Sequence, residues 1–345
     1  MKSKMKVFVP VLILSLLIIA GGTVNADDLP EMIEYDQSLE GETVDVVAAF
    51  ANKEQVFEKF TEDTGIKIEP LTMSSGEVLS RMKAEGRSMA DLWFGGGVDS
   101  FIEAKNDGLL QRYESEMIEN IPEQYRDEDG YWMGNNLVIT GFVVNEEILE
   151  DLGLDMPRTW EDLTDPQYEG EILMSDPAIS GTNYAILASI LQEKGWDEGW
   201  QFWEDLSANI PYFAQRGSEP HQKTVLGEVA IGITYMDGGI MALPEENPIK
   251  PVFPEDGIPW VTGNSAIFEG AENAEAAATF LDWVYSDRGQ KYIKDLNQTI
   301  MVSPYLDNPP ALAEAPLDQL MDIDLNKFGE DRAEILEEWE MRIGN

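Results

Sequence analysis

The sequence contains no cysteine and only one histidine, His221, among its 345 residues. The absence of cysteine excludes disulfide bonds, thiolate metal sites, a cysteine nucleophile and the N-terminal lipid attachment that needs a cysteine. Catalysis by histidine would rest on one side chain at a polar helix start, where we expect it to be solvated. Basic residues are also few, since 23 Lys and Arg stand against 66 Asp and Glu for a formal net charge of −43. This excess argues against nucleic acid and anionic membrane surfaces as partners.

Long apolar runs are absent apart from residues 7–20, which are fewer than the roughly 20 residues of a membrane-spanning helix. This run follows a basic segment with Lys2, Lys4 and Lys6 and precedes the small residues Val24-Asn25-Ala26. We therefore predict a signal peptide over residues 1–26, cleaved after Ala26, and a chain exported to the periplasm. The remaining chain is long enough for two domains, and 43% hydrophobic residues are typical of a folded core.

The first part of the exported chain alternates between strand and helix patterns. The β-prone runs are residues 43–50, 66–71 and 91–94, and the helical patterns between them are residues 53–61 and 76–86. This alternation predicts a parallel sheet of α/β type. Ligands of such sheets collect at the carboxyl ends of the strands, so we expect a crevice there.

Two short segments follow these strand ends. Ser74 to Glu77 has the spacing of a capping box, in which the serine and the glutamate satisfy each other's backbone N–H groups. Gly95 to Gly97 follows the third strand but lacks the spacing of a dinucleotide fingerprint. A helix cap and a tight turn explain both segments as well as a ligand does, so both interpretations stay open on this evidence.

Residues 174–184 form a turn-rich stretch between a short apolar run and a predicted helix over 184–195. Ser180 or Thr182 can cap this helix, and Gly181 allows another group to approach the backbone. Because a helix start presents unpaired N–H groups and the positive end of the helix dipole, it can bind an anion. Most such starts only cap their own helix, so the stretch alone does not decide.

Eight short segments occur in the order and spacing of one protein family. They are residues 44–50, 57–67, 91–96, 141–145, 160–163, 180–182, 227–232 and 273–277. On these segments the chain resembles the extracellular solute-binding proteins of ABC importers. It is most similar to the branch that holds the ferric-ion, hexose-phosphate, phosphoglycerate and aminoethylphosphonate binders.

The resemblance implies the type II periplasmic binding protein fold, an α/β fold with two lobes, two hinge strands and a ligand cleft between the lobes. The β-prone segments 137–144 and 260–268 match the hinges. Lobe 1 would then comprise residues 27–140 plus 266–345, and lobe 2 residues 141–265. The resemblance further implies a monomer that delivers a small solute to an ABC permease in the inner membrane.

The resemblance also implies a set of ligand-binding residues. In the second lobe they are Ser180, Gly181, Thr182, Ser218 and Asp237, and in the first lobe Ser75, Gly76, Gly95 and Gly96. Further candidates are Glu77, Trp93, Trp132 and Tyr235, of which the two tryptophans would line the organic part of the solute.

One departure bears on the ligand. Ferric-ion binders of this branch carry adjacent tyrosines where this chain has Tyr235-Met236, and a single phenolate is a poor ferric site. The resemblance therefore favours a phosphorylated or phosphonylated organic anion, whose oxygens helix starts and hydroxyl groups can satisfy. Ferric iron and a polyamine are the alternatives. Arg216 is the only cation that the sequence places near these segments, which weakens the anion prediction.

An exported hydrolase is the competing class of function. The sequence has neither a G-x-S-x-G nucleophile elbow nor an H-E-x-x-H zinc motif. Close acid pairs such as Asp162 with Asp165 arise by chance in so acidic a chain. We therefore predict a binding protein without catalytic residues, cofactor or resident metal.

Overall fold

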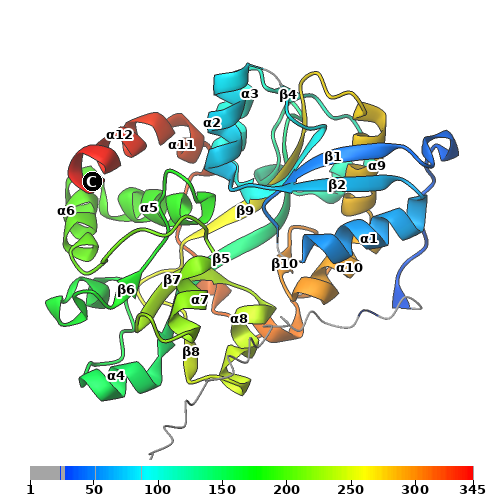
Figure 1. Ribbon diagram of the computed structural model, residues 1–345. Helices are drawn as coiled ribbons and strands as arrows, with labels where there is room; N and C mark the ends of the chain where they lie inside the picture. The colour runs from blue at the N-terminus through cyan, green and yellow to red at the C-terminus, as the bar shows by residue number, and fades with distance from the viewer. Residues whose placement is uncertain (1–23, 25–27, 51, 87, 345) are drawn as a thin grey trace, which may run out of the picture.

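A computed structural model describes residues 24, 28–50, 52–86 and 88–344 of the chain. The predicted signal peptide lies outside the described residues except for Val24. Two α/β halves lie on either side of a central pair of long strands (Figure 1). Among the described residues, no helix has both the length and the apolar character that crossing a membrane requires.

In the described part of the chain, a ten-stranded sheet connects the two halves, with the order β2-β1-β3-β9-β5-β7-β6 along its main path. The strands are β1 (Thr43–Ala48), β2 (Lys67–Thr72), β3 (Leu92–Gly97), β4 (Leu110–Gln111), β5 (Met133–Asn145), β6 (Ile172–Leu173), β7 (Ile231–Met236), β8 (Ile249–Val252), β9 (Trp260–Phe268) and β10 (Ile300–Met301). Strands β1, β2 and β3 pair in parallel, which confirms the predicted parallel sheet. The predicted strand 260–268 has the same bounds as β9.

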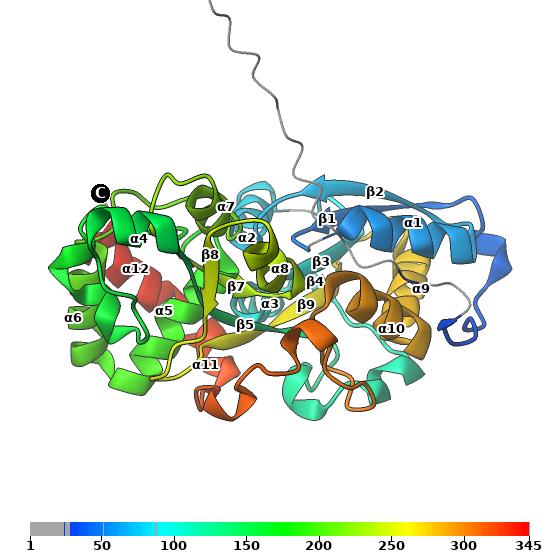
Figure 2. The same cartoon turned by 90° about the horizontal axis from the view of Figure 1, so that it is seen from below.

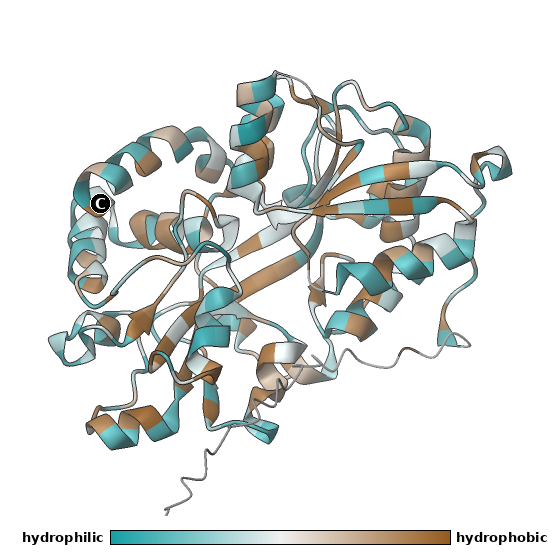
Figure 3. Ribbon diagram, viewed as in Figure 1, coloured by the Kyte–Doolittle hydropathy of each residue, from teal (hydrophilic) through white to brown (hydrophobic). Residues whose placement is uncertain are grey.

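Helices cover the sheet. They are α1 (Lys53–Thr64), α2 (Ser75–Glu85), α3 (Val98–Asn106), α4 (Glu146–Leu152), α5 (Gly181–Lys194), α6 (Trp196–Ser207), α7 (Glu219–Val225), α8 (Gly238–Ala242), α9 (Ala274–Tyr285), α10 (Asp287–Asn297), α11 (Leu325–Glu330) and α12 (Arg332–Arg342). Apolar residues gather on the central strands, and polar residues on the outward sides of the helices (Figure 3). This pattern is that of a sheet buried on both faces.

The two long strands β5 and β9 run between the halves (Figure 2). They pair with each other in antiparallel fashion, while β9 also pairs with β3 in one half and β5 with β7 in the other. Strand β5 begins at Met133 rather than at the predicted Leu137. The segment Gly134 to Asn136 has low strand propensity and contains a register shift against β9, which explains why the pattern did not reveal it.

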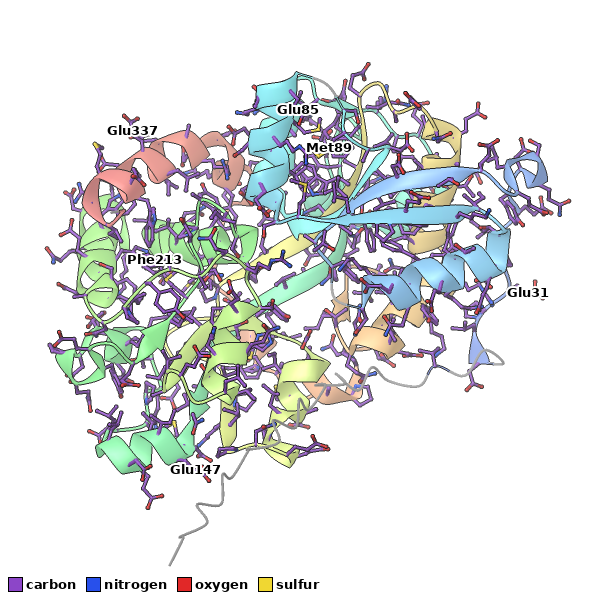
Figure 4. The ribbon with its side chains drawn as sticks, viewed as in Figure 1. Glu31, Glu85, Met89, Glu147, Phe213 and Glu337 are labelled. Carbon is purple, nitrogen blue, oxygen red and sulfur yellow. The ribbon has the colours of Figure 1, made fainter. Side chains whose placement is uncertain are left out.

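The C-terminal helices contact both halves. Arg332 donates from Nε to Oδ2 of the buried Asp99 on α3, over 2.9 Å. At the other end of the segment, the buried Trp339 ring lies 6.0 Å from the ring of Trp203 and 5.0 Å from that of Phe213. Figure 4 shows Glu337 on the outer side of α12. The predicted division puts residues 266–345 in lobe 1. Helix α12 nevertheless packs against Trp203 and Phe213, which that division assigns to lobe 2.

Replacing Trp339 by alanine should lower the free energy of unfolding by about 3 to 5 kcal/mol, because it removes a buried indole that packs against two other rings. Met341, two residues on and 65% exposed, provides the matched control. Met341→Ala should change stability by less than about 0.5 kcal/mol. Urea unfolding measures both variants, and equal effects would contradict a stabilising role of the packing around Trp339.

Candidate functional site

A cavity of about 330 Å³ lies between the two halves. Its wall includes most of the predicted binding residues: Ser75, Gly96, Ser180, Gly181, Thr182, Ser218, Tyr235 and Asp237. The hinge strands contribute Asn136 and Gly263. The size falls in the range of small-molecule sites.

The start of helix α5 forms one part of the wall. Ser180 caps the helix, because its Oγ accepts from the backbone N–H and from Nδ2 of Asn183, over 3.4 and 3.1 Å. Of the two residues predicted as caps, Ser180 therefore has this role. The amides of Gly181 and Thr182 have no acceptor among the described residues. They leave the positive end of a 14-residue helix at the cavity, which suits an anion.

Ser75 faces this helix start from the other half. The residue is 2% exposed, and its Oγ has no hydrogen-bond partner among the described residues. A Cβ placed on Gly181 would lie 2.6 Å from this oxygen. An unpaired buried hydroxyl costs about 1 to 3 kcal/mol. A ligand oxygen in the cavity would remove this cost, so Ser75 and the start of α5 form one potential site.

The two halves touch on both sides of the cavity. On one side the amide of Gly76 donates to the carbonyl of Ile179 over 3.2 Å, and on the other the amide of Gly238 donates to the carbonyl of Gln298 over 3.1 Å. A Cβ on Gly76 would lie 2.2 Å from the carbonyl oxygen of Ala178. Only glycine permits this approach of the two backbones, so Gly76 acts at the contact rather than in the cavity wall.

Among the described residues, the cations that line the cavity are Lys53 and Arg216. Arg216 is exposed, and among the described residues no carboxylate lies within ion-pair distance of its guanidinium. The Nζ atom of Lys53 lies 3.3 Å from a carboxylate oxygen of the exposed Glu54. The expectation that Arg216 is the only nearby cation is therefore wrong. Lys53 begins α1, the helix that follows the carboxyl end of β1 after a short loop, and this position is the signal that could have identified it.

Asp237 lines the cavity where β7 ends. It caps α8, since Oδ1 accepts from the amide of Ile240 over 3.0 Å. Partial burial raises the pKa of its carboxyl to about 6, although hydrogen bonds from the amides of Ile240 and Gly239 act in the opposite direction. Burial, together with the charge of Asp237, also raises the pKa of the Tyr235 phenol. The phenol therefore stays protonated at neutral pH.

Asp237→Asn should raise the free energy of unfolding by about 3 kcal/mol at pH 7.5 and by only about 1 kcal/mol near pH 4.5. The folded pKa lies above the ordinary value of 3.8, so the folded state binds the proton more tightly than the unfolded chain. The stability linked to this proton is complete below about pH 4 and is lost as the pH rises through about 6. Asparagine keeps the capping oxygen. Urea unfolding at both pH values tests this, and a variant that is less stable than wild type at pH 7.5 would contradict it.

His221 is buried, so the expectation of a solvated side chain is wrong. It is 8% exposed, its Nδ1 lies 3.3 Å from Oγ1 of Thr234, and its ring lies 5.6 Å from that of Tyr235. His221 lies on helix α7, and this helix packs against strand β7. Burial lowers the pKa of the imidazole to about 4, so His221 is neutral at physiological pH.

The remaining candidate residues lie outside the cavity wall. Trp93 and Trp132 are buried in the core, where the ring of Trp93 lies 4.0 Å from that of Phe101. Glu77 accepts from the amide of Ser74 over 2.9 Å, and the predicted capping box is confirmed. Gly95 has a φ of +89° and packs behind the wall against the backbone of residue 49.

The polar wall residues that were not predicted include Asn136, Asn297 and Thr299. Nδ2 of Asn136 donates to Oγ1 of Thr299 over 3.2 Å, and Oδ1 of Asn297 accepts from Nδ2 of Asn52 over 2.8 Å. Asn297 ends helix α10, which the sequence analysis did not predict. No local pattern marks these residues, because they reach the cavity only through the tertiary fold.

In the described part of the chain, no three Asp, Glu or His side chains come close enough to hold a metal ion. The wall offers amides, hydroxyl groups and two cations on one hand, and one carboxyl group on the other. This geometry suits a small solute with an anionic group better than a bare cation.

A molecule with two α/β halves, two connecting strands and a cavity between the halves belongs to the class of two-lobed solute-binding proteins. The family profile described as bacterial extracellular solute-binding protein matches residues 88–327. The chain belongs to this family, whose members bind solutes as periplasmic components of ABC transporters and are not catalytic. This confirms the predicted fold and family.

Particular relatives support this assignment. An uncharacterized protein of Haemophilus influenzae is 30% identical over 294 residues, which cover 82% of this chain and 85% of that protein. The structure of the periplasmic binding protein AfuA from Actinobacillus pleuropneumoniae, with fructose-6-phosphate bound, has a TM-score of 0.82 at 27% identity and covers 88% of this chain and 99% of that one. Iron-bound HitA from Pseudomonas aeruginosa has a TM-score of 0.75 at 20% identity, covering 88% and 100%, and shows the fold alone. Other relatives are named for iron uptake and for phosphoglycerate transport.

Proposed function

We propose that this substrate-binding component of an ABC transporter captures a phosphorylated or phosphonylated organic anion between its two lobes. It acts as a monomer after cleavage behind Ala26 and delivers the solute to a permease in the inner membrane. One observation is the main support for this class of ligand. The unpartnered Ser75 hydroxyl and the two free amides at the start of α5 converge on one cavity from opposite halves.

The charges of the cavity wall support an anion. Lys53 and Arg216 both line the cavity of a chain whose net charge is −43. The wall is therefore richer in cations than the chain as a whole, which carries about three acidic residues for each basic one. Neutral donors and cations together can satisfy the oxygens of a phosphate or phosphonate group. AfuA, which has fructose-6-phosphate bound, offers a precedent in a similar fold.

Ferric iron is the second candidate, since iron-bound HitA shares the fold. Against it, Tyr235 is followed by Met236, and the raised pKa of its phenol disfavours the phenolate form. Asp237 would be the other nearby anionic ligand. A hard trivalent cation needs several such oxygen ligands, so the wall supports iron less well.

Thermal melting of the exported protein against a solute panel tests this function. The panel contains sugar phosphates, phosphoglycerates, phosphonates, a polyamine, and ferric iron with citrate. A solute at 100 times its Kd should stabilise the fold by about 2.7 kcal/mol. We expect the shift in Tm with phosphate or phosphonate compounds, and a shift with iron or the polyamine alone would overturn the proposal.

A further inference from the structure

A buried ion pair lies outside the cavity and has no part in the site described above. Arg332, at the start of α12, is 8% exposed and donates from Nε to Oδ2 of the wholly buried Asp99 over 2.9 Å. The Ser100 hydroxyl donates to the same oxygen over 3.1 Å, whereas Oδ1 of Asp99 has no partner among the described residues. Apolar residues of similar volume often stabilise a fold as well as a buried ion pair does, so stability alone does not explain this pair.

The guanidinium of Arg332 contacts two helices that the predicted division assigns to different lobes. Besides Asp99, its Nη1 donates to Oε2 of Glu103 over 3.0 Å, and both acids belong to α3 in lobe 1. On the other side, its central carbon lies 5.6 Å from the ring centre of Tyr184, on α5 in lobe 2. The Tyr184 phenol donates to the carbonyl of Phe328 on α11 over 2.7 Å. The C-terminal helices therefore hold α3 and α5 through buried groups.

Asp99 lies behind the part of the cavity wall where α3 and α5 begin. A Cβ placed on Gly97 would lie 2.6 Å from Oδ1 of Asp99 and 3.1 Å from the carbonyl group of Gly181. Gly97 and Gly181 both line the cavity. The two helix starts therefore touch at the wall, and the Asp99 carboxylate packs against the back of this contact.

Without Arg332, the carboxylate of Asp99 would be buried with no countercharge. Such a group takes up a proton or draws water inward, and either change leaves the contacts of the guanidinium with Glu103 and Tyr184 unmade. The packing between α3 and α5 would loosen as a result. The free amides at the start of α5 would then lose their fixed position at the cavity wall.

We propose that Arg332 is a positioning residue for solute capture, which holds the starts of α3 and α5 together behind the cavity wall. It acts through Asp99 and Tyr184 and lies outside the wall itself. Any solute that is bound by the start of α5 depends on this contact, so the inference goes beyond the class of ligand proposed above.

Hydrogen exchange of the exported protein without any solute tests the positioning role. In Arg332→Met, the amides in the first turns of α3 and α5 should exchange at least about 10-fold faster than in the wild type, because local opening there becomes easier. Trp339→Ala is the matched control. Trp339 lies about 10 Å further along the same helix, where its ring packs against other aromatic rings. This control should leave exchange at both helix starts unchanged.

Titration calorimetry with glycerol 3-phosphate then connects positioning with capture. At a temperature where all variants are folded, Arg332→Met should bind this probe at least about 10-fold more weakly than the wild type, which is a typical coupling between two sites. Trp339→Ala should bind within about 2-fold of the wild type, since distant sites act independently.

A double variant, Asp99→Asn with Arg332→Gln, keeps the test decisive if Arg332→Met does not fold. It buries no charge at this position, and the two amides can form a hydrogen bond with each other. The glutamine is too short to keep the contacts with Glu103 and Tyr184. The double variant should therefore show faster exchange at both helix starts and weaker binding of glycerol 3-phosphate.

The outcomes separate the inference from the proposed function. Unchanged exchange at the helix starts in the Arg332 variants would overturn the inference, and so would an effect of equal size in Trp339→Ala. Faster exchange with unchanged affinity would also overturn it, because the helix starts would then not limit capture. If the wild type binds ferric citrate and no phosphate compound, the proposed function fails, while exchange and the affinity for ferric citrate still decide the inference.

Discussion

Thr182→Asp should lower the affinity of the cleft for a phosphate ester by at least about 100-fold. The substitution puts a carboxylate into the first turn of α5, where the free amides of residues 181 and 182 face the cavity. Two like charges about 4 Å apart repel by about 4 kcal/mol at the effective dielectric constant of a protein surface. That exceeds the roughly 2.7 kcal/mol of a 100-fold change. Titration calorimetry measures the loss.

Thr164→Asp is the matched control for charge. Thr164 ends a short 3-10 helix outside the cavity wall, and its hydroxyl donates to the carbonyl of Glu161. The control adds the same charge to the same lobe and should leave the affinity unchanged. If the two variants bind a phosphate ester equally well, the start of α5 is not the anion site.

Gly76→Val should weaken solute binding by at least about 100-fold while the protein stays folded. A Cβ at this position would lie 2.2 Å from the carbonyl oxygen of Ala178, so the two halves cannot meet as they do here. Rigid backbone on the other side leaves no flexible group to yield. Closure of the two lobes buries the solute, so a variant that cannot close leaves the solute without the contacts of one whole lobe. Gly76 occupies the first turn of α2, so the helix itself tolerates a side chain.

Small-angle scattering and calorimetry together measure this effect. The variant should remain in a more open form at solute concentrations that close the wild type. Ala84→Val, on an exposed position of the same helix, is the control for valine in α2 and should bind like the wild type. A Gly76 variant that closes and binds normally would show that the contact with residues 178 and 179 is dispensable.

The fold was predictable from local pattern to a large extent. Strand and helix periods identified β1 to β3 and their helices, and β9 appeared with its observed bounds, because β-branched runs and helix caps are local signals. The cap at Ser180 and the capping box at Ser74 and Glu77 were visible for the same reason. Gly134 to Asn136 hid the first part of β5, because their propensity disfavours the strand that tertiary pairing imposes.

The site was predictable only in part. Ser75, Ser180 and Asp237 follow strand ends or start helices, where sequence reasoning looks for ligands. Asn297 and Asn136 lack such a signal. Their part in the cavity depends on how α10 and the hinge strands are placed in space.

The two tryptophans were predicted to line the cavity but lie in the core. Trp93 belongs to the strand whose end borders the cavity, yet its indole stacks on Phe101 in the core instead of facing the cavity. Side chains alternate between the two faces of a strand, so a shift of one residue decides between core and crevice. Pattern alone could not determine which face of β3 would border the cavity.

The crystal structure of the exported protein with the phosphate or phosphonate compound that raises its Tm most tests the central claim directly. We predict the phosphorus group between the halves, with its oxygens within hydrogen-bond distance of Ser75 Oγ and of the amides of Gly181 and Thr182. An anion bound elsewhere, with Ser75 Oγ still unpartnered, would contradict the account. So would a solute whose only contacts are with Tyr235 and Asp237.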